Sequence, residues 1–267
     1  MQKYLTLEKR VGYTPLQELD ALKIARPELA GVPLTYAGRL DPMASGKLLV
    51  LIGDECKERS AYDHLDKEYE FEVLLGFESD TGDVLGFVQA GGGKSFEARD
   101  LKEVACSFVG RHAFPYPAFS SKTVHGKPLF EYALAGTLDT IDIPTTDVRI
   151  YKMQYLGKRV VSKNELIKNI LEKIDSLQIE GNTGRVANDF RKGEIIERWQ
   201  GLEGENDEQY VILRFKTIVS SGTYIRTLAP LIAEKLGTQG IAYSIHRTRI
   251  GRYHPITKSL GFWSTSF

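Results

Sequence analysis

An aspartate followed by proline, Asp41-Pro42, is the first place in this chain where residue type and setting suggest a reactive group. Proline biases the preceding residue toward an extended backbone, so the carboxylate of Asp41 would be presented from a loop in a fixed shape. The apolar run Leu48–Ile52 follows and predicts a buried strand behind that loop. Such a carboxylate could act as a nucleophile, but Asp-Pro is also a common turn pair. Spacing alone leaves both interpretations open.

Arg226 and Tyr69 are the other two candidates for chemistry. Arg226 falls on the first turn of a helix predicted from Thr223 to Leu236, where the helix dipole disfavours a cation unless a carboxylate lies nearby. Tyr69 lies on an alternating strand and could stack on a nucleic-acid base. From position and pattern alone, a solvent-facing arginine and a core aromatic are the stronger interpretations, so neither residue establishes a function by itself.

No metal or phosphate motif has the required spacing. Asp80-Thr81-Gly82-Asp83 lacks an EF-hand ligand ladder and predicts a turn with solvated carboxylates. Gly93-Lys94-Ser95 is not a phosphate loop, because Val88 stands where that motif needs a glycine. No His/Cys spacing matches a zinc site, and there is no Gly-x-Ser-x-Gly nucleophile turn. We therefore expect no metal site.

The composition is that of an ordinary globular protein, with 42% apolar residues among 267. No uncharged run approaches the roughly 20 residues of a membrane span, and the N-terminus carries charges inside its apolar stretch, so neither a span nor a signal peptide is expected. Cys56 and Cys106 cannot build a disulfide framework, which favours a cytoplasmic location. The 35 basic and 35 acidic residues cancel, which at first argues against a nucleic-acid partner.

Helical and alternating patterns are mixed without a regular βαβ repeat, which predicts an α+β fold with a largely antiparallel sheet. Residues 158–209 form an excursion between two predicted strands, with one helix capped by Ser162 and the remainder, including Glu203–Glu208, predicted as loop. No linker divides the chain, so we expect one domain over 1–267 with an insertion at about 158–209. The predicted helices begin near Thr14, Leu101, Ser162 and Thr223, with a short one closed by Gly136, and the predicted strands are 48–53, 67–77, 84–90, 146–156, 210–219 and 250–256.

Six blocks of the sequence, in order, resemble the blocks of one known family. Gly38-Arg39-Leu40-Asp41-Pro42-Met43-Ala44-Ser45-Gly46 is similar to the catalytic loop of the TruB family of tRNA pseudouridine synthases. Gly222-Thr223-Tyr224-Ile225-Arg226-Thr227-Leu228 is nearly identical to another block of that family. The other four are 53–57, 67–83, 117–131 and 245–251. The resemblance implies a pseudouridine synthase-type domain, a mixed and largely antiparallel sheet flanked by helices, that isomerises uridine in RNA. The implied target is position 55 in the T loop of tRNA.

The resemblance also implies roles for the three candidate residues. Asp41 would attack the ribose C1′ or assist departure of the base through a glycal-type route, and both routes stay open. Arg226 would pair with Asp41 and keep it ionised, and Tyr69 would stack on the detached base. The isomerisation has no redox step and no group donor, so no cofactor is expected.

RNA contacts are implied at further positions of the same blocks. Ile245 would close the pocket, and Tyr36 stands where the family has a His that holds the opened loop. The implied substrate-binding residues are Tyr36, Arg39, Lys57, Asp80, Phe119, Ser120, Lys122, Tyr224, Ile245, Arg247 and Arg249.

The implied partner is the tRNA T stem-loop, bound by a monomer. The family's C-terminal PUA domain would be absent, and residues 158–209 could substitute for it. Two alternatives stay open: a synthase acting on another RNA, or a non-catalytic tRNA-binding or folding protein on the same scaffold.

Zero net charge does not exclude RNA if the basic residues are local. His246–His254 contains Arg247, Arg249 and Arg252 and no acid, whereas acids gather elsewhere, as in Glu203–Glu208. This distribution predicts a local basic surface and RNA binding that weakens with salt along a shallow slope.

Overall fold

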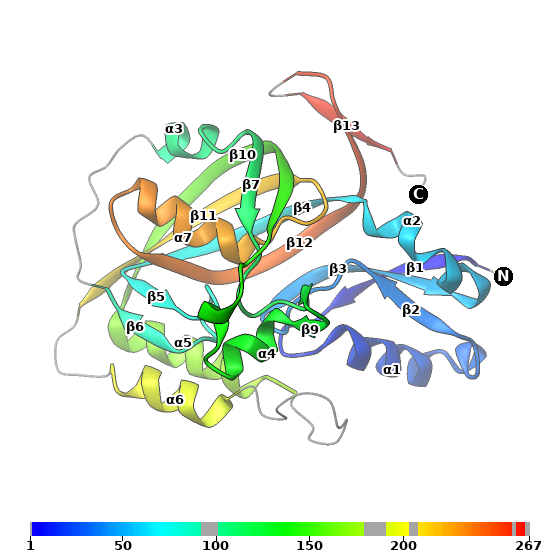
Figure 1. The fold of residues 1–267 in the computed structure, drawn as a ribbon, viewed down its shortest axis with the longest axis horizontal. Coiled ribbons are helices and arrows are strands. Elements are labelled where there is room, and N and C mark those ends of the chain that lie inside the picture. Colours follow the sequence, from blue (N-terminus) through cyan, green and yellow to red (C-terminus); the bar gives the residue numbers. More distant parts are fainter. Residues whose placement is uncertain (1, 92–100, 179–190, 203–207, 258–259, 265–267) are drawn as a thin grey trace.

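The computed structural model describes residues 2–91, 101–178, 191–202, 208–257 and 260–264. Its framework is one large mixed sheet with strand order β1-β3-β12-β4-β11-β10-β7, in which β2 also pairs with β3 and β13 with β12 (Figure 1). All these pairs are antiparallel except β12 with β3. The predicted α+β class with a largely antiparallel sheet is therefore confirmed. The strands are β1 (Tyr4–Lys9), β2 (Leu34–Ala37), β3 (Ala44–Ile52), β4 (Asp66–Leu75), β7 (Gly110–Pro115), β10 (Thr145–Ser162), β11 (Gln209–Val219), β12 (Gly240–Pro255) and β13 (Gly261–Ser264).

Helices begin largely where the sequence predicts them. The first helix has a capping box: the Thr14 hydroxyl accepts from the Gln17 amide, and the Gln17 side chain accepts from the Thr14 amide. The last helix, α7, packs on β12 and β4 and buries its apolar side toward the core. The helices are α1 (Pro15–Ala25), α2 (Arg59–Asp63), α3 (Leu101–Cys106), α4 (Leu129–Leu134), α5 (Lys163–Asp175), α6 (Lys192–Gln200) and α7 (Ile225–Lys235), with 3₁₀ turns at Pro27–Leu29, Gly53–Glu58 and Leu138–Thr140.

The central strand β4 is more buried than its alternation predicts. Tyr69, Phe71 and Val73 are buried as expected, but Glu68, on the face predicted to be polar, is buried too. Its carboxylate lies 3.1 Å from the Lys216 ammonium and accepts from a threonine hydroxyl, which compensates its removal from water. The prediction of a half-buried strand is therefore wrong at this position.

Two strand predictions differ from the structure in extent. The last strand was predicted only over residues 250–256, but β12 begins at Gly240, because two bulges, at 242/244 and 247/249, interrupt the alternation that marks a strand. Residues 84–90 were predicted as one strand, but only β6 (Val88–Ala90) forms, paired with β5 (Phe77–Ser79). A second small pair joins β8 (Thr123–Val124) to β9 (Lys127–Pro128).

The segment predicted as an insertion contains a helix that the sequence analysis missed. β10 continues to Ser162, α5 follows as predicted, and α6 stands where a loop was predicted. Ile195 and Trp199, four residues apart, bury one side of α6, and the Trp199 indole donates to the Val84 carbonyl at 3.1 Å. Residues 203–207 of the predicted acidic loop lie outside the described residues.

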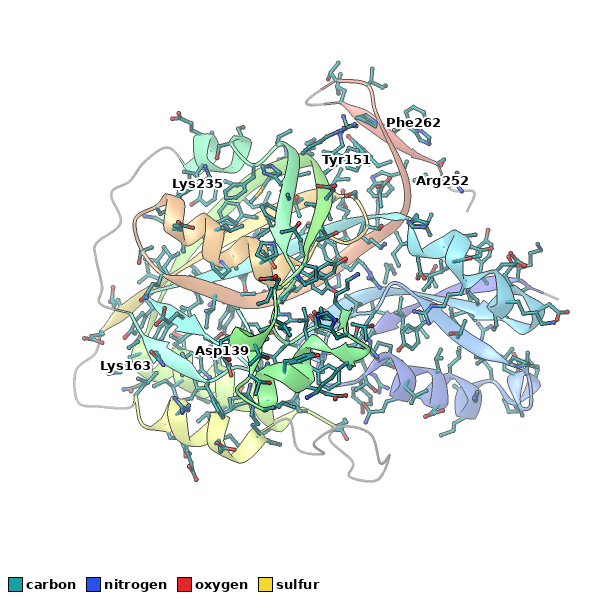
Figure 2. All side chains as sticks on the ribbon, viewed as in Figure 1. Asp139, Tyr151, Lys163, Lys235, Arg252 and Phe262 are labelled. Carbon is teal, nitrogen blue, oxygen red and sulfur yellow. The ribbon has the colours of Figure 1, made fainter. Side chains whose placement is uncertain are left out.

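The C-terminal part of β12 and the strand β13 form a hairpin that projects from the body of the protein (Figure 1). Figure 2 shows Arg252 and Phe262 on this hairpin, near Tyr151 on β10. No helix in the described ranges has the length and apolar character needed to cross a membrane.

Candidate active site

Asp41 and Arg226 meet between the loop that precedes β3 and the first turn of α7. The Arg226 Nε donates to Asp41 Oδ2 at 2.8 Å. The arginine side chain is only 5% exposed, whereas the aspartate side chain is 33% exposed. The exposed carboxylate is therefore available to a substrate, and the buried guanidinium fixes its orientation from behind. The pairing implied for these two residues is present in the structure.

Arg226 is held by three further groups. Its terminal nitrogens donate to the Thr81 carbonyl at 2.9 Å and to the Phe119 carbonyl at 3.0 Å, and Asp83 lies 3.6 Å from its Nε. Burial opposes the charge of this guanidinium, but the carboxylates of Asp41 and Asp83 outweigh that effect and raise its pKa. The guanidinium thus stays protonated and cannot turn away from Asp41.

Asp83 is a site residue that sequence reasoning missed. It was predicted as a solvated turn carboxylate, but its side chain is 5% exposed and faces Arg226. Burial raises the pKa of Asp83 to about 6, although Arg226 and the Thr81 hydroxyl favour its charged form. Gly82 allows this turn to approach α7, because a Cβ there would lie 2.9 Å from the Arg226 carbonyl oxygen. No local pattern reports this burial, since the contact is made with a helix more than 140 residues away.

Buried cations support the loop that carries Asp41. The fully buried Arg247 donates to the Gly38 carbonyl at 2.9 Å and the Lys47 carbonyl at 2.7 Å. The fully buried Lys9 ammonium donates to the Ala44 carbonyl at 2.6 Å. These bonds tie the loop and the start of β3 to two buried side chains, so together they fix the shape of the loop.

The position of Arg247 corrects the sequence analysis. It was predicted to contact RNA, but its side chain has no exposed surface and its guanidinium is bonded to main-chain carbonyls. Arg249, two residues on, is exposed as an RNA contact would require. The basic surface predicted from His246–His254 therefore lacks the charge of Arg247.

Ile245 and Tyr69 are buried and lie on adjacent strands of the sheet. Ile245 of β12 pairs with Ala44 at the start of β3, and Tyr69 of β4 pairs with Arg247 of β12. Tyr224 stands at the start of α7, where burial and the nearby Asp41 carboxylate raise its pKa. The roles implied for Tyr69, Ile245 and Tyr224 stay predictions.

The remaining residues of the central blocks approach the same region. Asp80 Oδ1 accepts from the Phe87 amide at 2.7 Å, and Phe119 contributes the carbonyl that binds Arg226. The Ser120 hydroxyl is buried and has no hydrogen-bond partner among the described residues. Lys122 places its ammonium 5.1 Å from the Tyr116 ring centre.

Tyr36 and Arg39 lie beside the catalytic loop, joined by a 3.4 Å contact between the Arg39 guanidinium and the Tyr36 hydroxyl. Lys57 does not come to the site. It lies past the C-terminal end of β3, whose N-terminal end adjoins the loop, and nine residues of strand span roughly 30 Å. Its ammonium pairs with the Asp54 carboxylate at 2.7 Å.

Among the described residues, no three His, Cys, Asp or Glu side chains are grouped so that they could hold a metal ion. The chemistry that this arrangement offers is that of one accessible carboxylate, oriented by a buried arginine, beside aromatic side chains. Such a carboxylate can add to an electrophilic carbon or remove a proton.

Comparisons with known proteins identify the family. The family model "TruB family pseudouridylate synthase (N terminal domain)" matches residues 31–167. The chain is 29% identical to tRNA pseudouridine synthase B of Bordetella avium, covering 93% of this chain and 81% of that protein. It is 28% identical to the Bacillus cereus protein of the same name, and the match covers 95% of this chain and 67% of that protein. It is also 28% identical to tRNA pseudouridine synthase 4 of Saccharomyces cerevisiae, and the match covers 86% of this chain and 64% of that protein.

Among solved structures, a chain from the crystal structure of a Cbf5-Nop10-Gar1 complex matches with a TM-score of 0.53 at 17% identity. That match covers 93% of this chain and 49% of the solved one, so this chain spans about half of its length. At this identity the match supports the fold. The family model covers just over half of the 267 residues, including Asp41, Tyr69 and Asp83, and the protein therefore belongs to the TruB family of pseudouridylate synthases.

Proposed function

We propose that this protein converts uridine to pseudouridine in tRNA, with Asp41 as its catalytic carboxylate. The observation that carries the proposal is the pairing of an accessible Asp41 with a buried Arg226, inside a chain of the TruB family. The names of the similar proteins from Bordetella avium, Bacillus cereus and yeast, all tRNA pseudouridine synthases, supply the substrate class.

The reaction exchanges one ribose–base bond for another. The bond from C1′ to N1 of uracil breaks, the base rotates, and a bond from C1′ to C5 forms; C5 then loses its proton and N1 gains one. Asp41 either adds to C1′ or removes the C2′ proton to give a glycal. Tyr69 would stack on the rotating base. The target nucleotide must leave its stack to reach the carboxylate.

The finer parts of the proposal are the target and the assembly. We infer position 55 in the T stem-loop as the target, and a cytoplasmic monomer as the working form. Both rest on the family resemblance of the sequence blocks around Asp41 and Arg226.

A non-catalytic RNA-binding role is the second candidate. Binding alone does not require a carboxylate held against a buried guanidinium, since a carboxylate repels phosphate. The arrangement of Asp41 and Arg226 therefore favours catalysis.

The test is incubation of the purified protein with an unmodified tRNA transcript, followed by mapping of pseudouridine with carbodiimide and primer extension. The matched control is a transcript with cytidine at position 55. The proposal predicts one stop, immediately 3′ of position 55, that disappears with the control transcript. A stop at another position would contradict the inferred target, and no stop in tRNA would contradict the proposed activity.

A further inference from the structure

Arg191 reaches the active site from a segment that none of the six resemblance blocks includes. It immediately precedes α6, the helix between β10 and β11, and has a left-handed backbone with φ of 60°. Its guanidinium lies 2.6 Å from Asp80 Oδ2, while its side chain is only 16% exposed. This helix therefore delivers a mostly buried cation to the turn that carries Asp80 and Asp83.

The guanidinium of Arg191 also packs against two aromatic rings. Its central carbon lies 4.0 Å from the centre of the Phe87 ring and 4.5 Å from the centre of the Phe119 ring. Cation–aromatic contacts at these distances are attractive and depend on the planar shape of the guanidinium. One side chain thus joins two separate segments, the turn after β5 and the stretch after β7.

Both segments hold Arg226, the arginine that orients Asp41. The Asp80–Phe87 turn supplies the Thr81 carbonyl, and the stretch after β7 supplies the Phe119 carbonyl; each accepts from Arg226 at 3.0 Å or less. The same turn is closed by the 2.7 Å bond from the Phe87 amide to Asp80. A change in the spacing of these segments would rotate the guanidinium of Arg226, and with it the Asp41 carboxylate.

We propose that Arg191 is a positioning residue for the isomerisation: it fixes the distance between the Asp80 turn and Phe119, and thereby the orientation of Arg226 against Asp41. This inference rests on the proposed function. A direct phosphate contact fits the surroundings less well, because Asp80 already balances the charge of Arg191 and two rings cover it. Phosphate binding is instead one outcome of the test.

The test compares Arg191→Leu and Arg191→Lys with Arg198→Leu as the matched control. Arg198, on the same helix, packs on the same Phe87 ring at 4.3 Å. Within the described ranges it forms no ion pair with Asp80 and no cation–aromatic contact with Phe119. Three quantities are measured for each variant: the single-turnover rate of pseudouridine formation at saturating enzyme, the Kd for tRNA, and the midpoint of thermal unfolding.

We expect Arg191→Leu to lower the single-turnover rate by about 10- to 100-fold, since sub-ångström shifts of catalytic groups have effects of this size, while the Kd changes less than about twofold. Arg191→Lys should recover part of the rate, because it keeps the ion pair but not the planar stacking. Arg198→Leu should keep the wild-type rate. Combining Arg191→Leu with Asp80→Asn should slow the reaction no further than the slower single variant.

Several results would overturn the inference. A weaker Kd with an unchanged rate would make Arg191 a substrate contact, and an unchanged rate and Kd would give it no role. An equal loss of rate in Arg198→Leu, with an equal fall in the unfolding midpoint, would make the effect one of general stability. A wild-type protein that forms no pseudouridine would instead refute the proposed function on which the inference rests.

Discussion

The guanidinium of Arg226 and the carboxylate of Asp41, 185 residues apart in the chain, are joined by a 2.8 Å hydrogen bond from Nε to Oδ2. The arginine is buried and the aspartate is partly exposed. This asymmetry gives the two residues different roles: the Asp41 carboxylate is accessible to a substrate, and Arg226 holds that carboxylate in place.

Replacing Arg226 with methionine should lower the single-turnover rate of pseudouridine formation by about 100-fold, because Asp41 loses its orienting partner. It should also lower the free energy of unfolding by roughly 3–5 kcal/mol, because Asp83 is left buried without a cation. Rate measurements and urea unfolding check the two effects. Adding Asp83→Asn should recover stability but not rate. A loss of tRNA affinity with an unchanged rate would refute the pairing role.

Arg247 and Arg249 should respond differently to salt. Arg249→Met removes an exposed cation, so the slope of log Kd for tRNA against log salt should become shallower by about 1. Arg247→Met removes a fully buried one, so that slope should not change, while the protein should lose about 3 kcal/mol of stability with the bonds to the loop carbonyls. Equal changes of slope in the two variants would show that Arg247 contacts RNA and would contradict this prediction.

Lys9 should make stability depend on pH in the alkaline range. Burial lowers its pKa from 10.5 to about 8 in the folded protein. Between these two pKa values the unfolded chain binds more protons than the folded protein, so the free energy of unfolding should rise with pH across that window. This contribution to stability is lost as the pH falls through 8.

Lys9→Met should therefore flatten the rise in stability by about 1 kcal/mol per pH unit, measured by urea unfolding between pH 8 and pH 10. Lys47→Met is the control, because Lys47 lies on the neighbouring strand β3 with its side chain 47% exposed. The lysine prediction is wrong if both variants keep the wild-type slope.

How far the sequence predicts this structure depends on how local each signal is. The capping box at Thr14 and the turn into α7 involve neighbouring residues, and both elements form where expected. Trp199 and Ile195 carried a four-residue spacing that marks a helix, but nine residues are too few to separate from a loop by pattern alone.

The candidate site shows the same dependence on local signals. The family blocks predicted the pairing of Asp41 with Arg226 correctly, because the resemblance does not depend on helix or strand periodicity. The role of Tyr69 stays a prediction. Asp83 and Arg247 were misplaced, because a carboxylate in a turn and an arginine in a basic segment usually face water. Their burial depends on contacts with distant segments, and no spacing in the sequence records those contacts.

The most direct test of the account is Asp41→Asn, assayed on an unmodified tRNA transcript for both product and binding. Asparagine keeps the size of the side chain but removes the charge that could add to C1′ or take a proton. We predict a tRNA Kd within about threefold of the wild-type value and no pseudouridine in a single turnover. Pseudouridine formation at a rate near that of the wild-type protein would contradict the assignment of Asp41 as the catalytic carboxylate.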